Sequence, residues 1–348
     1  MRLAFALVPV VVLAACKSST APGSAGVALW VANLNANTVV GYSAKQITSS
    51  TSAVPAITLG TPSGAGGNPF GRNTAIAFDH NGNLWVAETG TSPTMLVMYA
   101  ASQLLASANP KPAVSITSTP SDAFEAQPND SSIGVPLAIA FDASGNLWVA
   151  SAQGSHSSLL AFTPGQISTS GNVVPAIVIG SNGGSLDLPN ALAFDRSGNL
   201  WVADETEIVE FSASQLASSG NPLPVVTFSQ GSAINPFRPT QLAFDRTGNL
   251  WFTDLIASAI FEFAAHQLGT SGSPTPTVTI TASGTASPVI YPLAIAFDPQ
   301  GNLWVSSDTN AVSEFKANQI TTSGSPSPAV TLSGSTMATP IALAFRQP

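Results

Sequence analysis

Few side chains in this chain could do chemistry, because only 8% of its residues are charged and it has three histidines. Carboxylates stand three residues after a tryptophan at Glu88, Asp204 and Asp254, among polar neighbours. Such groups bind hard cations or exchange protons where several converge. Two arginines, Arg72 and Arg238, end the related strings NPFGR and NPFR. A guanidinium beside an aromatic ring suits a planar anion or a peptide.

Most other residues that look chemically active belong to an internal repeat. The segment AIAFDHNGNLWVAE (75–88) returns at 138–151, 191–204, 241–254 and 294–307. A second repeat places a glutamine before Ile or Leu in all six units. We interpret groups present in every unit as packing, turn-making or loop-bracing residues, because a catalytic group is normally unique. These residues are Trp30, Trp85, Trp148, Trp201, Trp251 and Trp304, and Gln46, Gln103, Gln166, Gln215, Gln267 and Gln319.

Each unit predicts four short strands. An apolar run such as LAFD ends at a D-x-x-G-N turn, and LWVA follows it as the second strand of a hairpin. A third strand such as 207–213 and a fourth such as 224–228 complete the unit. Four antiparallel strands in about 50 residues are typical of a propeller blade.

The repeat is split between the two ends of the chain. ALWVAN (28–33) opens the domain with the second half of a copy, and ALAF (342–345) ends it with the first half. If the two halves pair, one blade joins both ends and the ring has no free sheet edge. The sequence therefore predicts an all-β fold, a six-bladed β-propeller over 27–348, and disfavours an open solenoid, which needs polar caps.

Strand alternation sorts the connections onto two faces. The turn face carries the D-x-x-G-N turns and the glutamine loops, and the loop face carries the links after the second and fourth strands. Because the loop face differs in every unit, we expect binding there. It carries Arg72, Glu88, Asn190, Asp204, Arg238 and Asp254, and the longest insertion, 122–134, which adds Asp122, Glu125 and Asp130.

Arg72 and Arg238 lie in units three apart, so in a six-fold ring they should face each other. The alternative is that Asn-Pro-Phe makes a turn whose Phe70 or Phe237 caps a blade core. The histidines do not converge: His80 and His266 fall on the turn face, and His156 on the loop face.

The F-D-x-x-G-N-L-W-V-A repeats resemble the NHL-repeat and senescence-marker/gluconolactonase propellers, and GNLWFTD (248–254) also resembles virginiamycin B lyase. In lactonase-like members a central divalent metal is held by an Asn before a first strand, an Asp one blade later and a Glu near the N-terminus. Asn190 matches the first ligand, but Thr240 stands where the Asp belongs. The equivalent position in each unit lies four residues before the Phe of the AF pair, and half of its residues are aliphatic. These residues are Thr74, Leu137, Asn190, Thr240, Leu293 and Ile341.

The N-terminus predicts export. Residues 1–15 combine a positive start, a short apolar run and small residues before Cys16, which resembles a lipoprotein signal peptide with Cys16 as the acylated residue. Residues 16–26 read as the lipidated cysteine and a flexible tether. Cys16 is the sole cysteine, so no disulfide is expected. We expect lipid anchoring in the cell membrane or outer membrane, facing the periplasm or the cell exterior.

Composition narrows the partners. The formal net charge of −8 disfavours nucleic acid and anionic membrane surfaces, which leaves the lipid anchor as the expected contact with a membrane. We expect a monomer without a cofactor or metal, a non-enzymatic module that binds a protein, peptide or glycan. A metal-dependent lactonase, hydrolase or lyase is the alternative, and a structural envelope component the second alternative.

Overall fold

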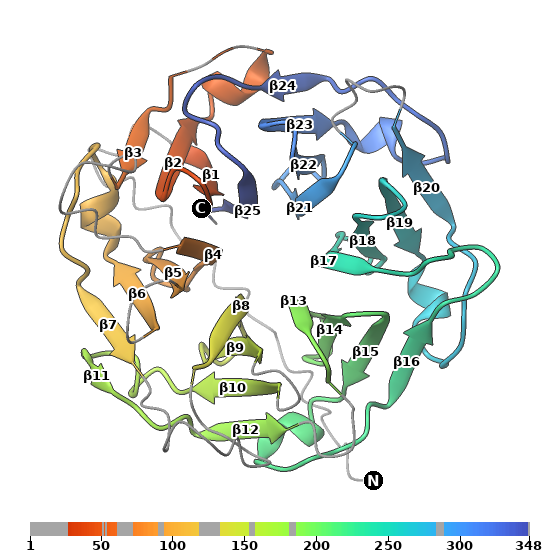
Figure 1. Ribbon diagram of the computed structural model, residues 1–348, viewed down its shortest axis with the longest axis horizontal. Coiled ribbons are helices and arrows are strands. Elements are labelled where there is room, and N and C mark those ends of the chain that lie inside the picture. Colours follow the sequence, from red (N-terminus) through yellow and green to blue (C-terminus); the bar gives the residue numbers. More distant parts are fainter. Residues whose placement is uncertain are drawn as a thin grey trace, which may run out of the picture.

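The protein is a six-bladed β-propeller (Figure 1). The computed structural model describes residues 27–50, 52, 54–60, 72–89, 94–117, 133–152, 157–180, 186–282 and 289–346. The innermost strands β4, β8, β13, β17, β21 and β25 surround the centre, and each packs on the innermost strands of the blades beside it. No helix among these residues is long and apolar enough to cross a membrane. Cys16 and residues 1–26 lie outside the described residues.

The blades, numbered in chain order, have the strand composition that the repeat predicts. Blade 1 contains β25 (Pro340–Phe345), β1 (Val27–Asn33), β2 (Thr38–Ser43) and β3 (Ile57–Leu59). Blade 2 contains β4 (Arg72–Phe78), β5 (Leu84–Thr89), β6 (Met95–Tyr99) and β7 (Val114–Thr117). Blade 3 contains β8 (Val135–Phe141), β9 (Leu147–Ala152), β10 (Ser158–Phe162) and β12 (Ile177–Gly180).

The remaining three blades repeat this order. Blade 4 contains β13 (Pro189–Phe194), β14 (Leu200–Asp204), β15 (Glu207–Phe211) and β16 (Val226–Ser229). Blade 5 contains β17 (Pro239–Phe244), β18 (Leu250–Asp254), β19 (Ala259–Phe263) and β20 (Val278–Thr281). Blade 6 contains β21 (Pro292–Phe297), β22 (Leu303–Ser307), β23 (Ala311–Phe315) and β24 (Val330–Leu332).

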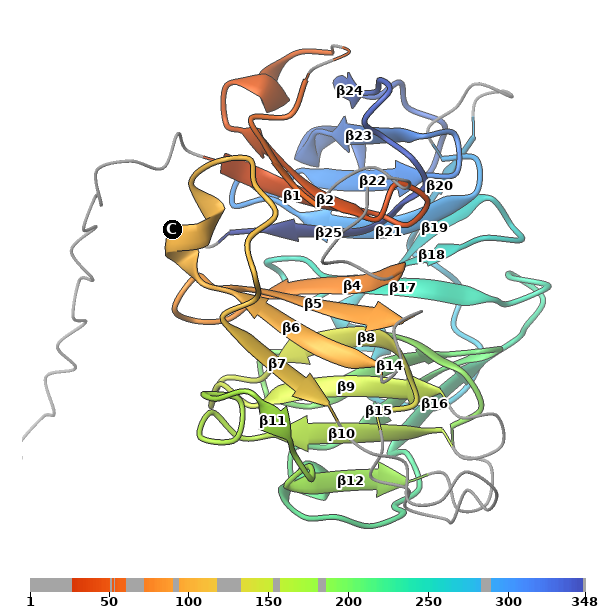
Figure 2. The ribbon, with the colours of Figure 1, turned by 60° about the vertical axis from the view of Figure 1, so that its left-hand side comes forward.

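The two ends of the chain close the ring, as the split repeat predicts. β25 pairs antiparallel with β1, with Val31 opposite Leu343 and Trp30 opposite Ala344. Phe345 then packs edge-on against Trp304 of blade 6, with ring centroids 6.0 Å apart. The C-terminal strand therefore supplies both the innermost strand of blade 1 and its contact with blade 6 (Figure 2).

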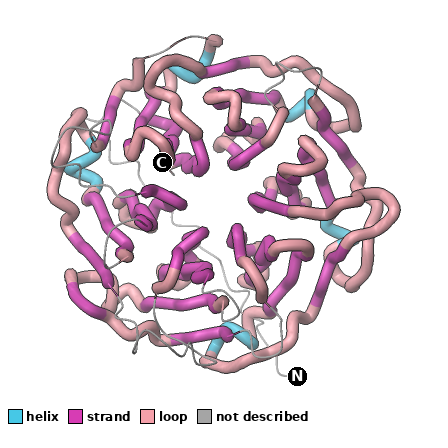
Figure 3. The backbone as a smooth tube through the Cα atoms, viewed as in Figure 1, coloured by secondary structure: helices cyan, strands magenta, loops and turns pink. Residues whose placement is uncertain are grey.

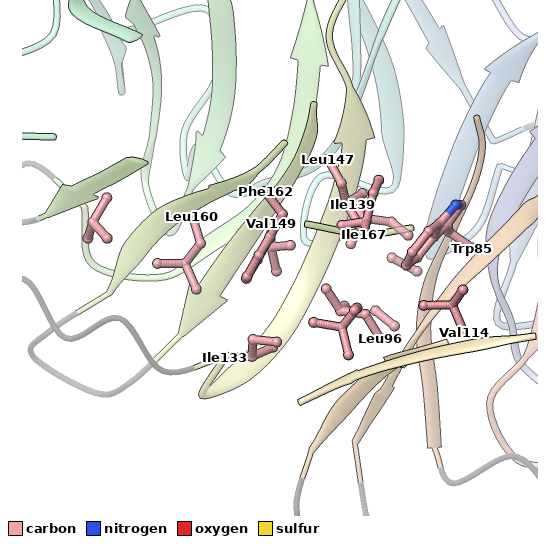
Figure 4. Close-up of a cluster of buried hydrophobic side chains, with 14 residues drawn as sticks. Trp85, Leu96, Val114, Ile133, Ile139, Leu147, Val149, Leu160, Phe162 and Ile167 are labelled. Atoms are coloured by element: carbon pink, nitrogen blue, oxygen red, sulfur yellow. The ribbon is translucent and has the colours of Figure 1, made fainter. Parts of the chain in front are cut away.

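The core lies between blades, so each blade buries its apolar faces only against its neighbours. The six tryptophans are buried, and each meets the phenylalanine that ends the next innermost strand, as Trp85 meets Phe141 at 6.2 Å. Figure 4 shows the cluster between blades 2 and 3, where Leu96 and Ile139 pack among other buried side chains. This confirms the packing interpretation of the tryptophans.

The aspartate of each D-x-x-G-N turn braces both the turn and the tryptophan. One oxygen of Asp79 accepts from the backbone N–H groups of Asn81 and Asn83, and the other accepts from the amide of Asn83 and, at 3.2 Å, from the indole N–H of Trp85. The turn glycines have φ between 73° and 88°, which Gly adopts without strain. The same bonds recur in blades 3 to 6.

The repeated glutamines are loop braces, as predicted. The side-chain oxygen of Gln46 accepts from the backbone N–H of Ser43 at 2.9 Å, and its amide nitrogen donates to the carbonyl of Val54 at 2.6 Å. The equivalent bonds form at the other five glutamines. Several of these loops contain a short 3₁₀ helix, such as η1 (Gln46–Thr48), at the outer edge of the ring (Figure 3).

A serine four residues after each glutamine links neighbouring blades. Its hydroxyl accepts from a backbone N–H of the outermost strand of the preceding blade, as Ser107 accepts from Thr58 at 2.9 Å. Thr331 of blade 6 donates to Ser50 of blade 1, so this outer ring also closes. The other serines are Ser170, Ser219, Ser271 and Ser323. In blade 2 the link extends to the two-residue strand β11 (Gly171–Asn172), which pairs parallel with β7 as a fifth strand.

Candidate functional site

The innermost strands begin on the loop face, and the residues at or immediately before these strand starts form a ring around the centre. We call this set the rim ring; its six members are Arg72, Val135, Leu188, Arg238, Tyr291 and Thr339. In every blade except blade 2 the next residue is a proline, which suits the first position of a strand because no ladder N–H is needed there. The rim ring therefore occupies equivalent backbone positions with five kinds of side chain, of which arginine occurs twice.

A β-bulge follows each rim residue by two positions. The register of the innermost strand shifts at Thr74, Leu137, Asn190, Thr240, Leu293 and Ile341. Bulges bend a strand and redirect side chains, and they are common beside functional sites. The bulged residue is the position at which the lactonase-like resemblance expects metal ligands, and all six side chains are partly exposed.

The described rim side chains expose apolar and charged groups together. Val135 is 46% exposed, Leu188 39% and Tyr291 51%. Tyr291 has a φ of 49°, a conformation that costs free energy for a bulky residue and is concentrated at functional sites. Arg238 is also exposed, and its guanidinium forms an ion pair with Glu205 at 2.6 Å.

The two arginines of the NPF strings both occupy rim positions. Arg72 begins β4, where its backbone pairs with Thr89, and Arg238 immediately precedes β17 on the opposite side of the ring (Figure 1). The side chain of Arg72 lies outside the described part of the structure. Phe237 is buried and packs edge-on against Phe252 at 5.5 Å, so this phenylalanine caps a blade core, as the alternative for NPF expects. Phe70 lies outside the described residues.

The acids three residues after a tryptophan lie on the loop face, but they are buried there. Asp204 is 5% exposed, while Asp254 and Glu88 are fully buried. The sequence predicts these acids among polar neighbours, but their side chains turn inward, and those of Asp204 and Asp254 accept backbone hydrogen bonds. Asp204 accepts from the N–H groups of Asp187 and Leu188 at 2.8 and 2.6 Å.

Asp254 holds its loop in the same way. It accepts from the N–H of Arg238 at 2.7 Å and from those of Ile256 and Ala257 at 3.0 and 2.9 Å. Asn33, the equivalent residue of blade 1, accepts from the N–H of Ala338 at 3.2 Å. These buried side chains hold the backbone at or beside the rim ring. This role could not be predicted from the sequence, because residue spacing alone does not show the direction of a side chain.

Burial has an electrostatic consequence at Asp204. Removal from water raises the pKa of its carboxyl to about 6, against the lowering effect of the N–H donors of Asp187 and Leu188. The charged form is therefore disfavoured in the folded protein, although it is the form that accepts these bonds best.

The residues proposed for metal binding do not form a ligand set among the described residues. No three His, Cys, Asp or Glu side chains converge there on a possible metal position. Asn190 is half-buried in the bulge ring, and Thr240 one blade later bonds the hydroxyl of Thr253 at 2.8 Å. His80 and His266 are exposed on the turn face, and His156 lies outside the described residues, as does 118–132, which contains most of the insertion.

A pocket of about 300 Å³ lies on the turn face, between blades 4 and 5. Its lining includes Phe194, Asp195, Arg196, Phe244, Asp245 and Leu268. Asp195 and Asp245 are the turn aspartates, so their oxygens already accept turn and indole hydrogen bonds. The polar wall of this pocket is therefore largely satisfied without a ligand.

Near this pocket, Glu262 on β19 is buried. Burial, followed by the charge of Asp245, raises the pKa of Glu262 to about 7. Glu262 is not among the candidate residues predicted from the sequence, although a Glu-Phe pair precedes the glutamine loop in blades 4, 5 and 6.

Comparison with solved structures confirms the propeller. The chain is similar to the periplasmic gluconolactonase PpgL of Pseudomonas aeruginosa at 14% identity and a TM-score of 0.54, covering 89% of this chain and 80% of that one. It is similar to a chain of a nidogen/laminin complex at 13% identity and a TM-score of 0.56, covering 92% and 99%. Virginiamycin B lyase of Staphylococcus aureus matches at 14% identity and a TM-score of 0.50, covering 84% and 78%.

These similarities define a class of protein, the six-bladed β-propellers, which includes both enzymes and binding domains. At such identities they show the fold alone. No family model matches the chain, and no curated protein matches it in sequence.

Proposed function

We propose that this protein is a lipid-tethered binding module of the cell envelope, which holds a protein or peptide at the rim ring of its loop face. The observation that carries the proposal is the composition of that ring. Exposed Val135, Leu188 and Tyr291 and the cation of Arg238 stand at equivalent backbone positions on a rigid frame. Binding surfaces commonly combine aromatic and arginine side chains in this way.

The ion pair of Arg238 is compatible with ligand exchange. Arg238 and Glu205 are each 45% exposed, and such surface pairs contribute only about 0–1 kcal/mol. A ligand carboxylate can replace Glu205 at little cost, while an apolar ligand side chain covers Leu188 or Tyr291. The ligand class that fits best is an acidic peptide segment with apolar residues; a glycan fits the aromatic ring of Tyr291 but not the aliphatic members.

The buried aspartates favour a preformed site. Asp204 and Asp254 bond the N–H groups of Leu188 and Arg238, so the rim backbone is held before a ligand arrives. A preorganised surface loses less entropy on binding. Export and acylation at Cys16, and kinship with NHL-repeat or gluconolactonase-like propellers, belong to this proposal.

The test begins with a photo-crosslinking amino acid at Tyr291 in cells, with Val54 on the turn face as the matched control position. The binding of the captured partner is then measured with Arg72→Ala/Arg238→Ala protein and with Lys111→Ala as the control. We expect weaker binding only for the double variant, with an unchanged melting temperature, since exposed arginines contribute under about 1 kcal/mol to folding. Normal binding by the double variant, together with loss on altering the D-x-x-G-N turns of folded protein, would overturn the assignment.

A metal-dependent lactonase, hydrolase or lyase is the second candidate, and the place of Asn190 in the bulge ring favours it. This reading requires stoichiometric divalent metal in the purified protein and a higher melting temperature with calcium or magnesium. It also requires that Asn190→Ala or Asp204→Ala remove that metal. Metal bound by the wild type and lost from both variants would replace the binding module with the enzyme.

A further inference from the structure

We propose that the turn face lies on the lipid surface into which the acyl chains of Cys16 insert, so that the rim ring points away from the membrane. This inference rests on the proposed lipid tether and adds an orientation to it. Three independent features of the turn face support it: the place where the chain enters the propeller, exposed apolar side chains, and exposed cations.

The chain enters the propeller on the turn face. Val27 at the start of β1 pairs with Ser43, which adjoins a glutamine loop. The backbone N–H of Arg346 donates to the carbonyl of Ala28. This bond is equivalent to the one within the D-x-x-G-N turn of blade 2, where the N–H of Asp79 donates to the carbonyl of Asn83. The start of β1 therefore lies where a D-x-x-G-N turn lies in the other blades, and a tether reaching it approaches from that side.

Exposed apolar side chains protrude from the same face. The backbone carbonyl of the residue eight positions after each repeated glutamine accepts a hydrogen bond from the glutamine amide, and a proline follows that residue. Val54 is 78% exposed, Val174 71% and Leu223 74% at this position in blades 1, 3 and 4. Val225 and Leu105, 50% and 44% exposed, extend this apolar band, whereas blades 5 and 6 carry Thr275 and Ser327.

The fully exposed charged side chains of the turn face are basic, whereas those of the loop face are mixed in sign. The basic side chains of the turn face are Lys45, Lys111, Arg196, Arg246, Lys316 and Arg346. The carboxylates of the turn face accept hydrogen bonds within the turns, as that of Asp79 does, or are buried in third strands, as that of Glu262 is. Lys316 is paired with Glu314, and the other basic residues of the turn face have no ion pair among the described residues. On the loop face, Asp187 and Asp308 are exposed, and the exposed cation Arg238 is paired with Glu205. An anionic bilayer therefore attracts the turn face more strongly, with about 1 kcal/mol for each basic residue near the surface.

This local pattern modifies the expectation drawn from net charge. The formal charge of −8 disfavours free association of the protein with an anionic surface. A tethered domain is already held at the membrane, so the charges of each face affect only its orientation. The acyl chains supply the anchoring, and basic and apolar contacts beside them set which face meets the membrane. Lys111 occupies the protruding position in blade 2, between the apolar positions of blades 1 and 3.

The short tether disfavours the opposite orientation. Ten residues, 17–26, span at most about 35 Å when fully extended. A seven-residue strand such as β1 already covers about 23 Å, to which the loops at both ends add. With the loop face on the bilayer, the tether would have to start from the far side of the propeller and be held nearly fully extended, at a cost in conformational entropy.

The experiment places a fluorescent probe on each face of the lipidated full-length protein. Acylation blocks the thiol of Cys16, so an introduced cysteine is the sole labelling site. Leu223→Cys reports the turn face and Ile256→Cys, a 59% exposed residue of the loop face, is the matched control. Labelled proteins are bound to phosphatidylglycerol/phosphatidylcholine vesicles that contain nitroxide-labelled lipid, and quenching is measured.

We expect loss of fluorescence at Leu223→Cys and none at Ile256→Cys. Adding Val54→Ser, Val174→Ser and Lys111→Glu should reduce the quenching at Leu223→Cys, whereas Tyr291→Ser should not. Equal quenching on both faces, or quenching at Ile256→Cys alone, would overturn the orientation. Flotation with the vesicles reports the anchor separately: protein that does not float contradicts the lipid tether and hence the proposed function, whereas floating protein with the wrong quenching pattern contradicts only this inference.

Discussion

Replacing Arg346 by aspartate should stabilise the propeller, because it supplies an acceptor that blade 1 lacks. In blades 2 to 6 the residue after the Phe of the innermost strand is Asp, and its carboxylate accepts from the tryptophan indole at 3.0 to 3.4 Å. Blade 1 has Arg346 at this place, with equivalent backbone bonding. Trp30 is fully buried, and its indole N–H has no hydrogen-bond partner among the residues that the structure describes.

The expected gain follows from the cost of that unpaired donor. An unsatisfied buried N–H costs about 1–3 kcal/mol, and a bond to a charged acceptor contributes about 1.5–3 kcal/mol. Desolvation of the new carboxylate and loss of the contact between the Arg346 side chain and the Gly82 turn offset part of this gain. We expect Arg346→Asp to raise the free energy of unfolding by about 1–2 kcal/mol, which corresponds to a melting temperature higher by roughly 2–4 °C.

The assay is urea unfolding followed by tryptophan fluorescence, together with a thermal melt. Arg346→Ala is the control, because it removes the guanidinium without adding an acceptor. A double-mutant cycle with Trp30→Phe isolates the indole bond, since Phe has no N–H to donate. If Arg346→Asp is no more stable than Arg346→Ala, or if its gain persists in the Trp30→Phe background, the indole of Trp30 is not the limiting group and the reasoning fails.

Deleting 339–348 removes β25 and leaves β1 with a free edge, so we expect aggregation or a steep loss of stability in a thermal melt; a melt equal to that of the full chain would refute closure by β25. Ser50→Ala, compared with Ser52→Ala as the exposed control, should destabilise by about 1 kcal/mol, because Thr331 loses its acceptor between blades 6 and 1. Asp204 has a folded-state pKa of about 6, above its usual value of 3.8. Between pH 3.8 and pH 6 the folded protein therefore binds more protons than the unfolded chain, so the free energy of unfolding falls as the pH rises through this range, by up to about 3 kcal/mol. Asp204→Asn should remove this part of the slope in urea unfolding from pH 4 to 7, and an unchanged slope would contradict the assignment.

Much of the fold follows from the repeat itself. Six copies of Trp and Gln, and the halves at 28–33 and 342–345, predict the blade number and the closure by β25, both of which the structure confirms. Such prediction succeeds because each blade obeys the same local rules of strand alternation and turn chemistry. The two faces were also assigned correctly, since the turn asparagines and glutamine loops bond each other, as Asn83 bonds the N–H of Ala101.

The candidate site was less predictable, because side-chain direction depends on neighbours distant in sequence. Spacing placed Asp204 and Asp254 on the loop face, but only the folded backbone shows that they turn inward to bond Leu188 and Arg238. The rim ring has no sequence motif common to all six blades, because its side chains are of five kinds and a proline follows in every blade except blade 2. The serine of each glutamine loop recurs in all six units and was a signal available in the sequence.

The sequence by itself determined the repeating unit, the number of blades and the joining of the ends, since these depend on periodicity and on turn residues that act within a few positions of the chain. Tertiary structure alone decided which equivalent residues are exposed and which are buried. It separates Val54, Val174 and Leu223 on the turn face from Leu188 and Tyr291 on the loop face, and it buries the indole N–H of Trp30 without a partner among the described residues. The physical reason is that burial and hydrogen bonding are set by packing between blades, whose residues are brought together only when the ring closes.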